Sequence, residues 1–266
     1  MKTMKKSTKL VMYLVLLVFA AIWIFPIFVA VQKSVQVNGF ESYLSVLNHP
    51  KVNYFRVIFN SFLISVITSA CVIMVTTLGG YAFSKMQFKG RNILYLLLLA
   101  CLAVPVSSVT MPIFYTIKNL NALNSYAGVI IPLIAFNAPM MLMMVRNYYD
   151  DIPDSLLEAA TIDGANSLQI YFKIMLPLSF PILANIGTLT FVYSWNDYLT
   201  PLLILRDEAK YTVTLAATYF METRSQTPEM VAQLYAALIL MTIPSVVVYL
   251  FSQRYLQSGT TAGSVK

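Results

Sequence analysis

The sequence is poor in charge and in the side chains that build catalytic or metal sites. Only 11% of its 266 residues are charged, and it holds one histidine and two cysteines. An ordinary soluble domain carries roughly 25% charged residues. The one histidine, His49, lies between Asn48 and Pro50, and no Ser/His/Asp set or buried carboxylate pair for hydrolysis is recognisable. We therefore predict no catalytic residue, no metal site and no enzymatic reaction on this chain.

The chain also lacks a phosphate-binding loop and a basic stripe. No glycine is followed at the required spacing by Gly-Lys-Ser or Gly-Lys-Thr, the arrangement whose amides hold nucleotide phosphates. We expect no cofactor on this chain, so any energy for pumping must come from elsewhere. The net charge of +7 comes from dispersed lysines and arginines, which indicate membrane topology rather than nucleic-acid binding. Cys71 and Cys101 fall in apolar runs and indicate no redox compartment.

Long apolar runs are abundant instead. Hydrophobic residues make up 58% of the chain, and its mean hydropathy is +0.71. A bilayer core about 30 Å thick requires roughly 20 apolar residues in a helix. Uncharged runs of that length occupy residues 10–32, 60–84, 92–117, 126–145, 176–194 and 230–253. The sequence therefore predicts an all-α integral membrane protein with six transmembrane helices, several of them kinked by internal prolines such as Pro105.

The distribution of basic residues predicts the topology. Lysines precede the first run, which is too long for a typical signal peptide and is interpreted as an uncleaved anchor. Six spans with the amino terminus inside place both termini and the second and fourth loops in the cytoplasm. Eleven of the 18 basic residues then lie inside, as the positive-inside rule requires. These are Lys2, Lys5, Lys6, Lys9, Lys85, Lys89, Arg91, Arg146, Lys173, Arg254 and Lys266.

The fourth loop, residues 146–175, contains the polar stretch EAATIDGANSLQIYFKIMLP, which starts at Glu158. It predicts two short helices. The first, of about 11 residues, should begin with three acids near Pro153 in its first turn and stop at Gly164. These acids are Asp150, Asp151 and Asp154. Asn166 or Ser167 should cap the second helix.

The first of these helices has a shape suited to a groove on a partner. Leu156, Leu157 and Ala160 are expected on one face, and Ala159 keeps the neighbouring surface low. The alternative is an interfacial helix on lipid headgroups. The loop has five acids against two basic residues, and an anionic leaflet should repel it. These residues are Asp150, Asp151, Asp154, Glu158 and Asp163 against Arg146 and Lys173. A soluble protein partner is the favoured interpretation.

The same loop resembles that of a known family. Glu158, Ala159 and Ala160, then Gly164, then Leu176 with Pro177 resemble the "EAA" loop of permease subunits in binding-protein-dependent ATP-binding-cassette importers. The resemblance implies that the first helix is a coupling helix, which docks in a cleft of a separate ATPase subunit. The residues it implies for this contact are Leu156, Leu157, Glu158, Ala159, Ala160, Asp163 and Gly164.

The resemblance covers nearly the whole chain. NSFLISV from Asn60, AFSKMQFKGR from Ala82, SWNDYLTPL from Ser194 and the tail from Gln253 resemble the second permease subunit of the carbohydrate branch. This implies the type I importer permease fold, a second and different permease, two copies of a cytoplasmic ATPase that bind ATP and Mg, and an extracytoplasmic sugar-binding protein. It also implies a location in the bacterial cytoplasmic (inner) membrane.

The expected organisation follows from the resemblance and the spans. Residues 1–54 hold the amino-terminal tail, the first span and the first external loop. Residues 55–255 form the transmembrane domain with the EAA loop at 150–177, and residues 256–266 form a cytoplasmic tail. The external loop at 206–229 mixes charges of both signs, as a solvated loop does. The resemblance implies, as an alternative, that part of this loop contacts the docked binding protein.

Polar residues within the spans are the candidates for substrate contact. Asp197 is the acid at the outer end of the fifth span, just after the run 176–194, and Trp195 and Asn196 precede it. An aromatic face with hydrogen-bonding neighbours suits a sugar, whereas an aromatic belt at the outer interface is the structural alternative. Asn137 and Asn185 are further candidates, for which hydrogen bonds between helices are the alternative. Gly79 and Gly80 are expected to permit close helix packing.

Two alternatives to a sugar importer remain open from the sequence. The first is the same machinery with glycerol phosphate or a polyol as cargo. A phosphate cargo would be expected to require a basic residue within the membrane, and the six runs contain none. The other is a self-contained secondary carrier or channel, which would need ion-coupling or filter residues in its own spans.

Overall fold

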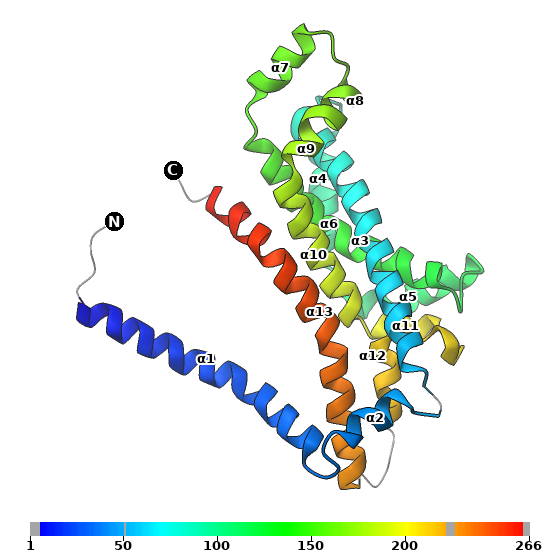
Figure 1. Ribbon diagram of the computed structural model, residues 1–266. Coiled ribbons are helices and arrows are strands. Elements are labelled where there is room, and N and C mark those ends of the chain that lie inside the picture. The colour runs from blue at the N-terminus through cyan, green and yellow to red at the C-terminus, as the bar shows by residue number, and fades with distance from the viewer. Residues whose placement is uncertain (1–5, 51, 222–226, 263–266) are drawn as a thin grey trace. The chain divides into compact units, whose positions relative to one another are not determined.

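The computed structural model describes residues 6–50, 52–221 and 227–262, and within these ranges the regular structure is entirely helical (Figure 1). The expected all-α membrane fold is therefore confirmed. Lys2, Lys5, residues 222–226 of the external loop and the last four residues of the tail lie outside the described residues. The chain divides into two compact units, Met1–Tyr54 with Ala217–Thr242 and Phe55–Ala216 with Ile243–Lys266.

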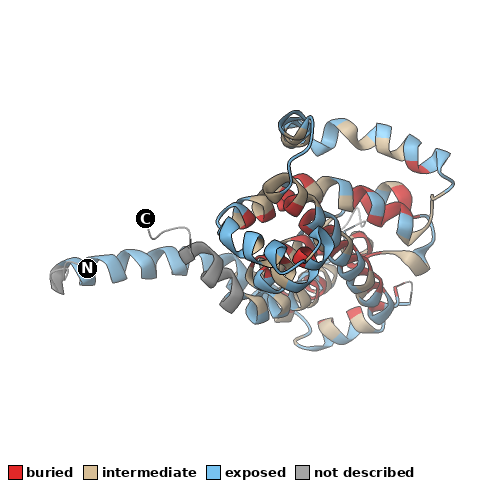
Figure 2. Ribbon diagram, turned by 90° about the horizontal axis from the view of Figure 1, so that it is seen from above, coloured by how far each residue is buried: buried red, intermediate tan, exposed pale blue. Residues whose placement is uncertain are grey.

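The first unit contains α1 (Lys6–Val35), α2 (Glu41–Leu47), the 3₁₀ turn η4 (Ala217–Phe220) and the first part of α13 (Pro228–Ala262). The Ser34 and Tyr43 hydroxyls join α1 to α2 at 2.7 Å. The Tyr54 hydroxyl donates to the Ala237 carbonyl at 3.4 Å. The His49 ring packs edge-on against Phe220 with centroids 5.1 Å apart. Most of α1 is exposed along its length (Figure 2), as expected of a helix that faces lipid or another chain.

The second unit holds the remaining helices and the larger core. In chain order they are α3 (Tyr54–Lys85), α4 (Arg91–Ala100), η1 (Cys101–Ala103), α5 (Val106–Asn119), α6 (Tyr126–Asp150), α7 (Asp154–Ile162), α8 (Ser167–Ile170), the π-helical η2 (Tyr171–Met175), α9 (Leu176–Leu178), α10 (Phe180–Asn196), α11 (Leu199–Ile204), η3 (Glu208–Lys210), α12 (Val213–Ala216) and the second part of α13.

The predicted spans are found, but two of them are broken. Four described helices are long and apolar enough to cross a membrane, and two bent pairs raise the number to six if each pair counts as one span. The pair 91–103 and 106–119 bends by 105°, and the pair 167–178 and 180–196 bends by 75°. The expectation of a continuous, merely kinked helix over 92–117 is therefore wrong. Pro105 has no N–H and forces Val104 into extended backbone (φ −84°, ψ 116°), so the helix ends there.

The helices α3 and α6 approach each other closely, as expected from Gly79 and Gly80. A Cβ atom at Gly79 would lie 2.7 Å from Leu142 Cδ1, and one at Gly80 would lie 2.6 Å from Val145 Cγ1. The expectation of close packing is confirmed. A buried cluster joins α3, α6, α8, η2 and α10 at the end of the unit that bears α7. Its members are Val72, Tyr81, Met141, Val145, Tyr149, Ile170, Tyr171, Met175, Ile182 and Ile186.

Candidate functional site

The candidate site is the short helix α7, which has a sharp turn at each end. Pro153 is its N-cap residue in extended backbone, and Asp154 stands in its first turn, where a negative charge complements the helix dipole. The expected boundary was wrong by several residues: Asp150 is the last residue of α6, and Asp151 is the C-cap of α6. Pro153 disfavours helical backbone in the residue before it, so α7 starts later and has 9 residues rather than about 11.

The expected stop at Gly164 is confirmed. Gly164 has φ +83°, a left-handed conformation that glycine adopts without steric cost. The Gly164 N–H donates to the Thr161 carbonyl at 3.0 Å, and the Ala165 N–H donates to the Ala160 carbonyl at 2.9 Å. These two bonds form a Schellman motif, which satisfies carbonyls that the helix end would otherwise leave unpaired.

The next helix, α8, is capped by Asn166, one of the two residues that the sequence proposed. Asn166 Oδ1 accepts from the Gln169 N–H, and Gln169 Oε1 accepts from the Asn166 N–H, both at 2.9 Å. This reciprocal pair is a capping box. With the Schellman motif, it fixes the backbone directly after α7.

The two sides of α7 face different surroundings. Leu157 and Ala160 are half-buried and pack against the apolar cluster described above. Leu156 is 47% exposed, so its expected place on the same face as Leu157 and Ala160 is wrong. Glu158 and Ala159 are exposed as well. The outer face of α7 therefore comprises Leu156, Glu158, Ala159, Ile162 and Asp163.

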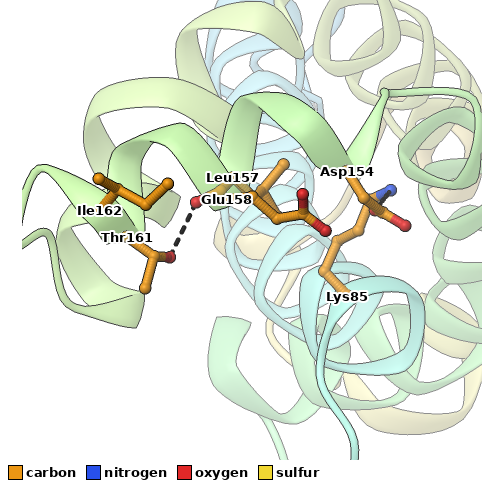
Figure 3. A pocket seen from close by; sticks show the side chains of 6 residues that line it. All are labelled: Lys85, Asp154, Leu157, Glu158, Thr161 and Ile162. Atoms are coloured by element: carbon orange, nitrogen blue, oxygen red, sulfur yellow. Dashed lines mark hydrogen bonds and ion pairs between the residues drawn. The ribbon is translucent and has the colours of Figure 1, made fainter.

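Ile162 is the member of the outer face that the sequence analysis missed. Its side chain is 86% exposed, which leaves a large apolar surface at the last residue of α7. Its spacing of four residues from Glu158 places it on the same side of a helix, and this signal could have identified it. Figure 3 shows Glu158, Thr161 and Ile162 along a groove of about 480 Å³, which Leu157, Asp154 and Lys85 complete.

Lys85 is the second residue that sequence reasoning missed, because it was counted only as a topology charge. It is the last residue of α3. Its Nζ atom donates to Asp154 Oδ1 and to the Ile152 carbonyl, both at 2.7 Å. Next to it, the Ser84 hydroxyl donates to Asp150 Oδ1 at 2.6 Å. The end of α3 is thus bonded to both sides of the turn that leads into α7.

Two of the substrate candidates, Asn137 and Trp195, are buried. Asn137 lies on α6, is 7% exposed, and donates to the Leu133 carbonyl of its own helix at 2.7 Å. Trp195 is 1% exposed and stacks on Phe191 with centroids 5.7 Å apart. The indole face is therefore covered in this conformation, and its contact with a sugar stays a prediction. Asn185, on α10, is half-buried.

Asn196 and Asp197 lie at the end of α10. Asn196 is exposed and donates to the Val192 carbonyl at 2.8 Å. Asp197 is the C-cap residue of α10, and its Oδ2 accepts from the Thr200 N–H at 3.2 Å. Its carbonyl also accepts from the Thr214 hydroxyl at 2.7 Å. These bonds give Asp197 a structural role in the turn between α10 and α11, and a sugar contact stays a prediction.

Comparison with known proteins identifies relatives over most of the chain. Residues 76–261 match the family model described as "Binding-protein-dependent transport system inner membrane component". The chain is 31% identical over 231 residues to the arabinooligosaccharides transport system permease protein AraQ of Bacillus subtilis, which covers 87% of this chain and 80% of the relative. It is 38% identical over 202 residues to the sn-glycerol-3-phosphate transport system permease protein UgpE of Yersinia enterocolitica, covering 76% and 71%.

A solved structure shares the fold as well. A chain from the crystal structure of a bacterial ABC transporter involved in the import of the acidic polysaccharide alginate superposes with a TM-score of 0.79. The two chains are 25% identical, and the match covers 96% of this chain and 100% of that chain. The type I importer permease fold expected from the EAA loop is thereby confirmed.

Proposed function

Because this chain belongs to the family of binding-protein-dependent inner membrane transport components, we propose that it is one of two different permease subunits of an ATP-driven sugar importer. It forms half of the translocation pathway. The relatives named for arabinooligosaccharides and the alginate importer support an oligosaccharide as cargo. Membership of this family favours the importer over a self-contained secondary carrier or channel.

The proposed assembly adds a second permease, two copies of a cytoplasmic ATPase and an extracytoplasmic sugar-binding protein. The ATPase supplies the sites for ATP and Mg, since this chain has no phosphate-binding loop. Basic residues surround the α7 end of the second unit, which supports a cytoplasmic position for α7 and for both termini by the positive-inside rule. They are Lys85, Lys89, Arg91, Arg146 and Lys173.

The exposed outer face of α7 is the observation on which the coupling role depends. Leu157 and Ala160 attach the helix to its own chain, and the Schellman motif at Gly164 fixes its end. Glu158 and Ile162 remain free to enter a cleft on a partner, with one charged and one apolar side chain. This combination is typical of a short helix that docks in a groove.

Charge reversal at Glu158 should release the ATPase. Purification of the tagged chain from gently solubilised membranes should recover a second permease and an ATPase, both identifiable by mass spectrometry. In Glu158→Lys, a positive charge faces the part of the ATPase cleft that binds the Glu158 carboxylate. The recovery of ATPase should therefore fall about tenfold. Glu41→Lys makes the same change of charge on the exposed start of α2 and should leave the recovery unchanged. Equal recovery of ATPase with Glu158→Lys would contradict the proposal.

Glycerol phosphate is the second candidate cargo, because the relative named for it is 38% identical. The lack of basic residues in the six apolar runs favours an uncharged sugar. The binding protein that co-purifies with the chain can be used to distinguish the two cargoes. Oligosaccharides should raise its thermal unfolding midpoint by several degrees at saturating concentration, and glycerol 3-phosphate should not. The reverse result would assign the phosphate cargo.

We propose that the external turn at residues 206–208 contacts the extracytoplasmic binding protein. Asn124 Oδ1 accepts from the N–H groups of Arg206 and Asp207, each at 3.1 Å, and Lys210 Nζ donates to the Asn124 carbonyl at 2.8 Å. These bonds fix the backbone of the turn, from which the side chains of Arg206, Asp207 and Glu208 are exposed. A fixed, charged turn suits recognition of a docked soluble protein.

A further inference from the structure

One buried cation, Lys85, links the start of α7 to the end of α3. The Lys85 side chain is only 6% exposed, whereas its partner Asp154 is 74% exposed. A buried ammonium is costly unless its donors are paired. Lys85 meets this requirement with two acceptors at 2.7 Å, one carboxylate and one backbone carbonyl. Figure 3 shows the Lys85 side chain beside that of Asp154. Charge-assisted bonds of this length are stronger and more directional than neutral ones.

The two charges also complement the helices on which they stand. Lys85 is at the carboxyl end of α3, where the helix dipole favours a cation. Asp154 is in the first turn of α7, where the dipole favours an anion. Fully exposed ion pairs contribute little, but removing the partner of a buried charge leaves that charge uncompensated. Asp154 and Ile152 therefore fix the start of α7 against the end of α3, in addition to the non-directional apolar packing of Leu157.

The helix α3 is also held at its other end. Asn60 Nδ2 donates to the carbonyls of Ala209 and Tyr211, each at 3.0 Å, and the Ser61 hydroxyl accepts from the Val213 N–H at 2.8 Å. Asn60 and Lys85 lie about 38 Å apart along a helix, by the rise per residue. No proline interrupts α3, so it connects the α7 turn with the external 206–213 segment as one continuous element.

We propose that Lys85 is a positioning residue which, through Asp154, transmits the movement of α7 to α3 and so to the external segment bonded at Asn60. This inference rests on the proposed coupling of α7 to an ATPase. It predicts that breaking the link between Lys85 and Asp154 separates ATP hydrolysis from transport while the assembly stays intact. Lys85 lines the same groove as Glu158 and Ile162, but its Nζ atom is bonded to Asp154 and to the Ile152 carbonyl rather than lying on the outer face of α7. The contact of α7 with the ATPase should therefore persist.

The test measures labelled oligosaccharide transported per ATP hydrolysed, with the purified assembly in proteoliposomes. Lys85→Met keeps the length of the apolar stem but removes both bonds, so this ratio should fall about tenfold, within the usual range of coupling between sites. Lys85→Arg keeps the charge and should retain at least half of the wild-type ratio. Asp154→Asn, at an exposed position, should lower the ratio about threefold. Asp151→Asn removes the same charge three residues away and should leave the ratio unchanged.

The outcomes separate this inference from the proposed function. A wild-type assembly that contains no ATPase would contradict the proposed function. A wild-type assembly that transports, with an unchanged ratio in Lys85→Met, would overturn the inference alone. If Lys85→Met fails to assemble, an unchanged ratio in Asp154→Asn overturns it instead. Hydrogen exchange of the α7 amides can be measured on the purified chain without transport. The exchange should be faster in Lys85→Met than in the wild type, and equal exchange rates would also overturn the inference.

Discussion

Replacing Gly164 with valine is expected to uncouple ATP hydrolysis from transport without preventing membrane insertion. The φ angle of +83° at Gly164 is unfavourable for an L-residue by about 1–2 kcal/mol, and a β-branched side chain is the least tolerant of it. A Cβ atom at Gly164 would meet nothing within 4 Å, so the effect comes from the backbone alone. Loss of the Schellman motif should tilt the end of α7 and misplace Asp163. Transport per ATP should then fall about fivefold or more.

Gly164→Asn is the matched variant for this prediction. Asparagine tolerates the left-handed conformation better than other L-residues, so it should keep most of the coupling. ATP hydrolysis and oligosaccharide uptake are measured in parallel with the reconstituted assembly. Uptake at the wild-type rate in Gly164→Val would show that the geometry at the end of α7 does not matter for coupling, and the coupling role of α7 would then be wrong.

Gly128→Val should abolish stable folding of the chain. Gly128 lies in the first turn of α6, where its N–H donates to the Ser125 cap at 3.1 Å. A Cβ atom there would lie 2.2 Å from the Ala122 carbonyl oxygen and 3.0 Å from Ile204 Cγ2. The carbonyl belongs to the backbone and cannot rotate away as a side chain can. We therefore expect a loss of about 3 kcal/mol or more of stability, at the upper end for overpacked cores.

The measurement for Gly128→Val is the amount of monodisperse chain after solubilisation, followed by size-exclusion chromatography with a fluorescent tag. The neighbouring residue Ala127 is exposed, so Ala127→Val adds the same methyl groups where space is available. The control should behave like the wild type, whereas Gly128→Val should yield little monodisperse material. Equal yields would mean that the turn before α6 can rearrange at small cost.

The sequence predicted the elements whose signals are local. The span α3 was expected at 60–84 and is found at Tyr54–Lys85, because apolar runs of bilayer length dominate the pattern. The stop at Gly164 and the cap at Asn166 follow from residue types that favour those positions. The composition of the EAA loop likewise indicated a short helix with an exposed face, and its partner stays a prediction.

The features that were missed depend on contacts between distant segments. Hydropathy does not distinguish a kink at Pro105 from a break, since both halves stay apolar while their directions differ by 105°. The burial of Trp195 depends on its packing against Phe191, and no pattern in α10 predicts which side of the helix is covered. Lys85 and Asp154 are 69 residues apart, so their bond is visible only in the folded chain.

The most direct test of the importer function is uptake of a panel of labelled malto- and arabino-oligosaccharides by proteoliposomes that contain the purified assembly. Uptake is expected only when ATP is on the side of α7 and the binding protein is on the other side, and no uptake is expected with this chain alone. Uptake by the chain alone, without ATP, would contradict the importer function and would support a self-contained carrier.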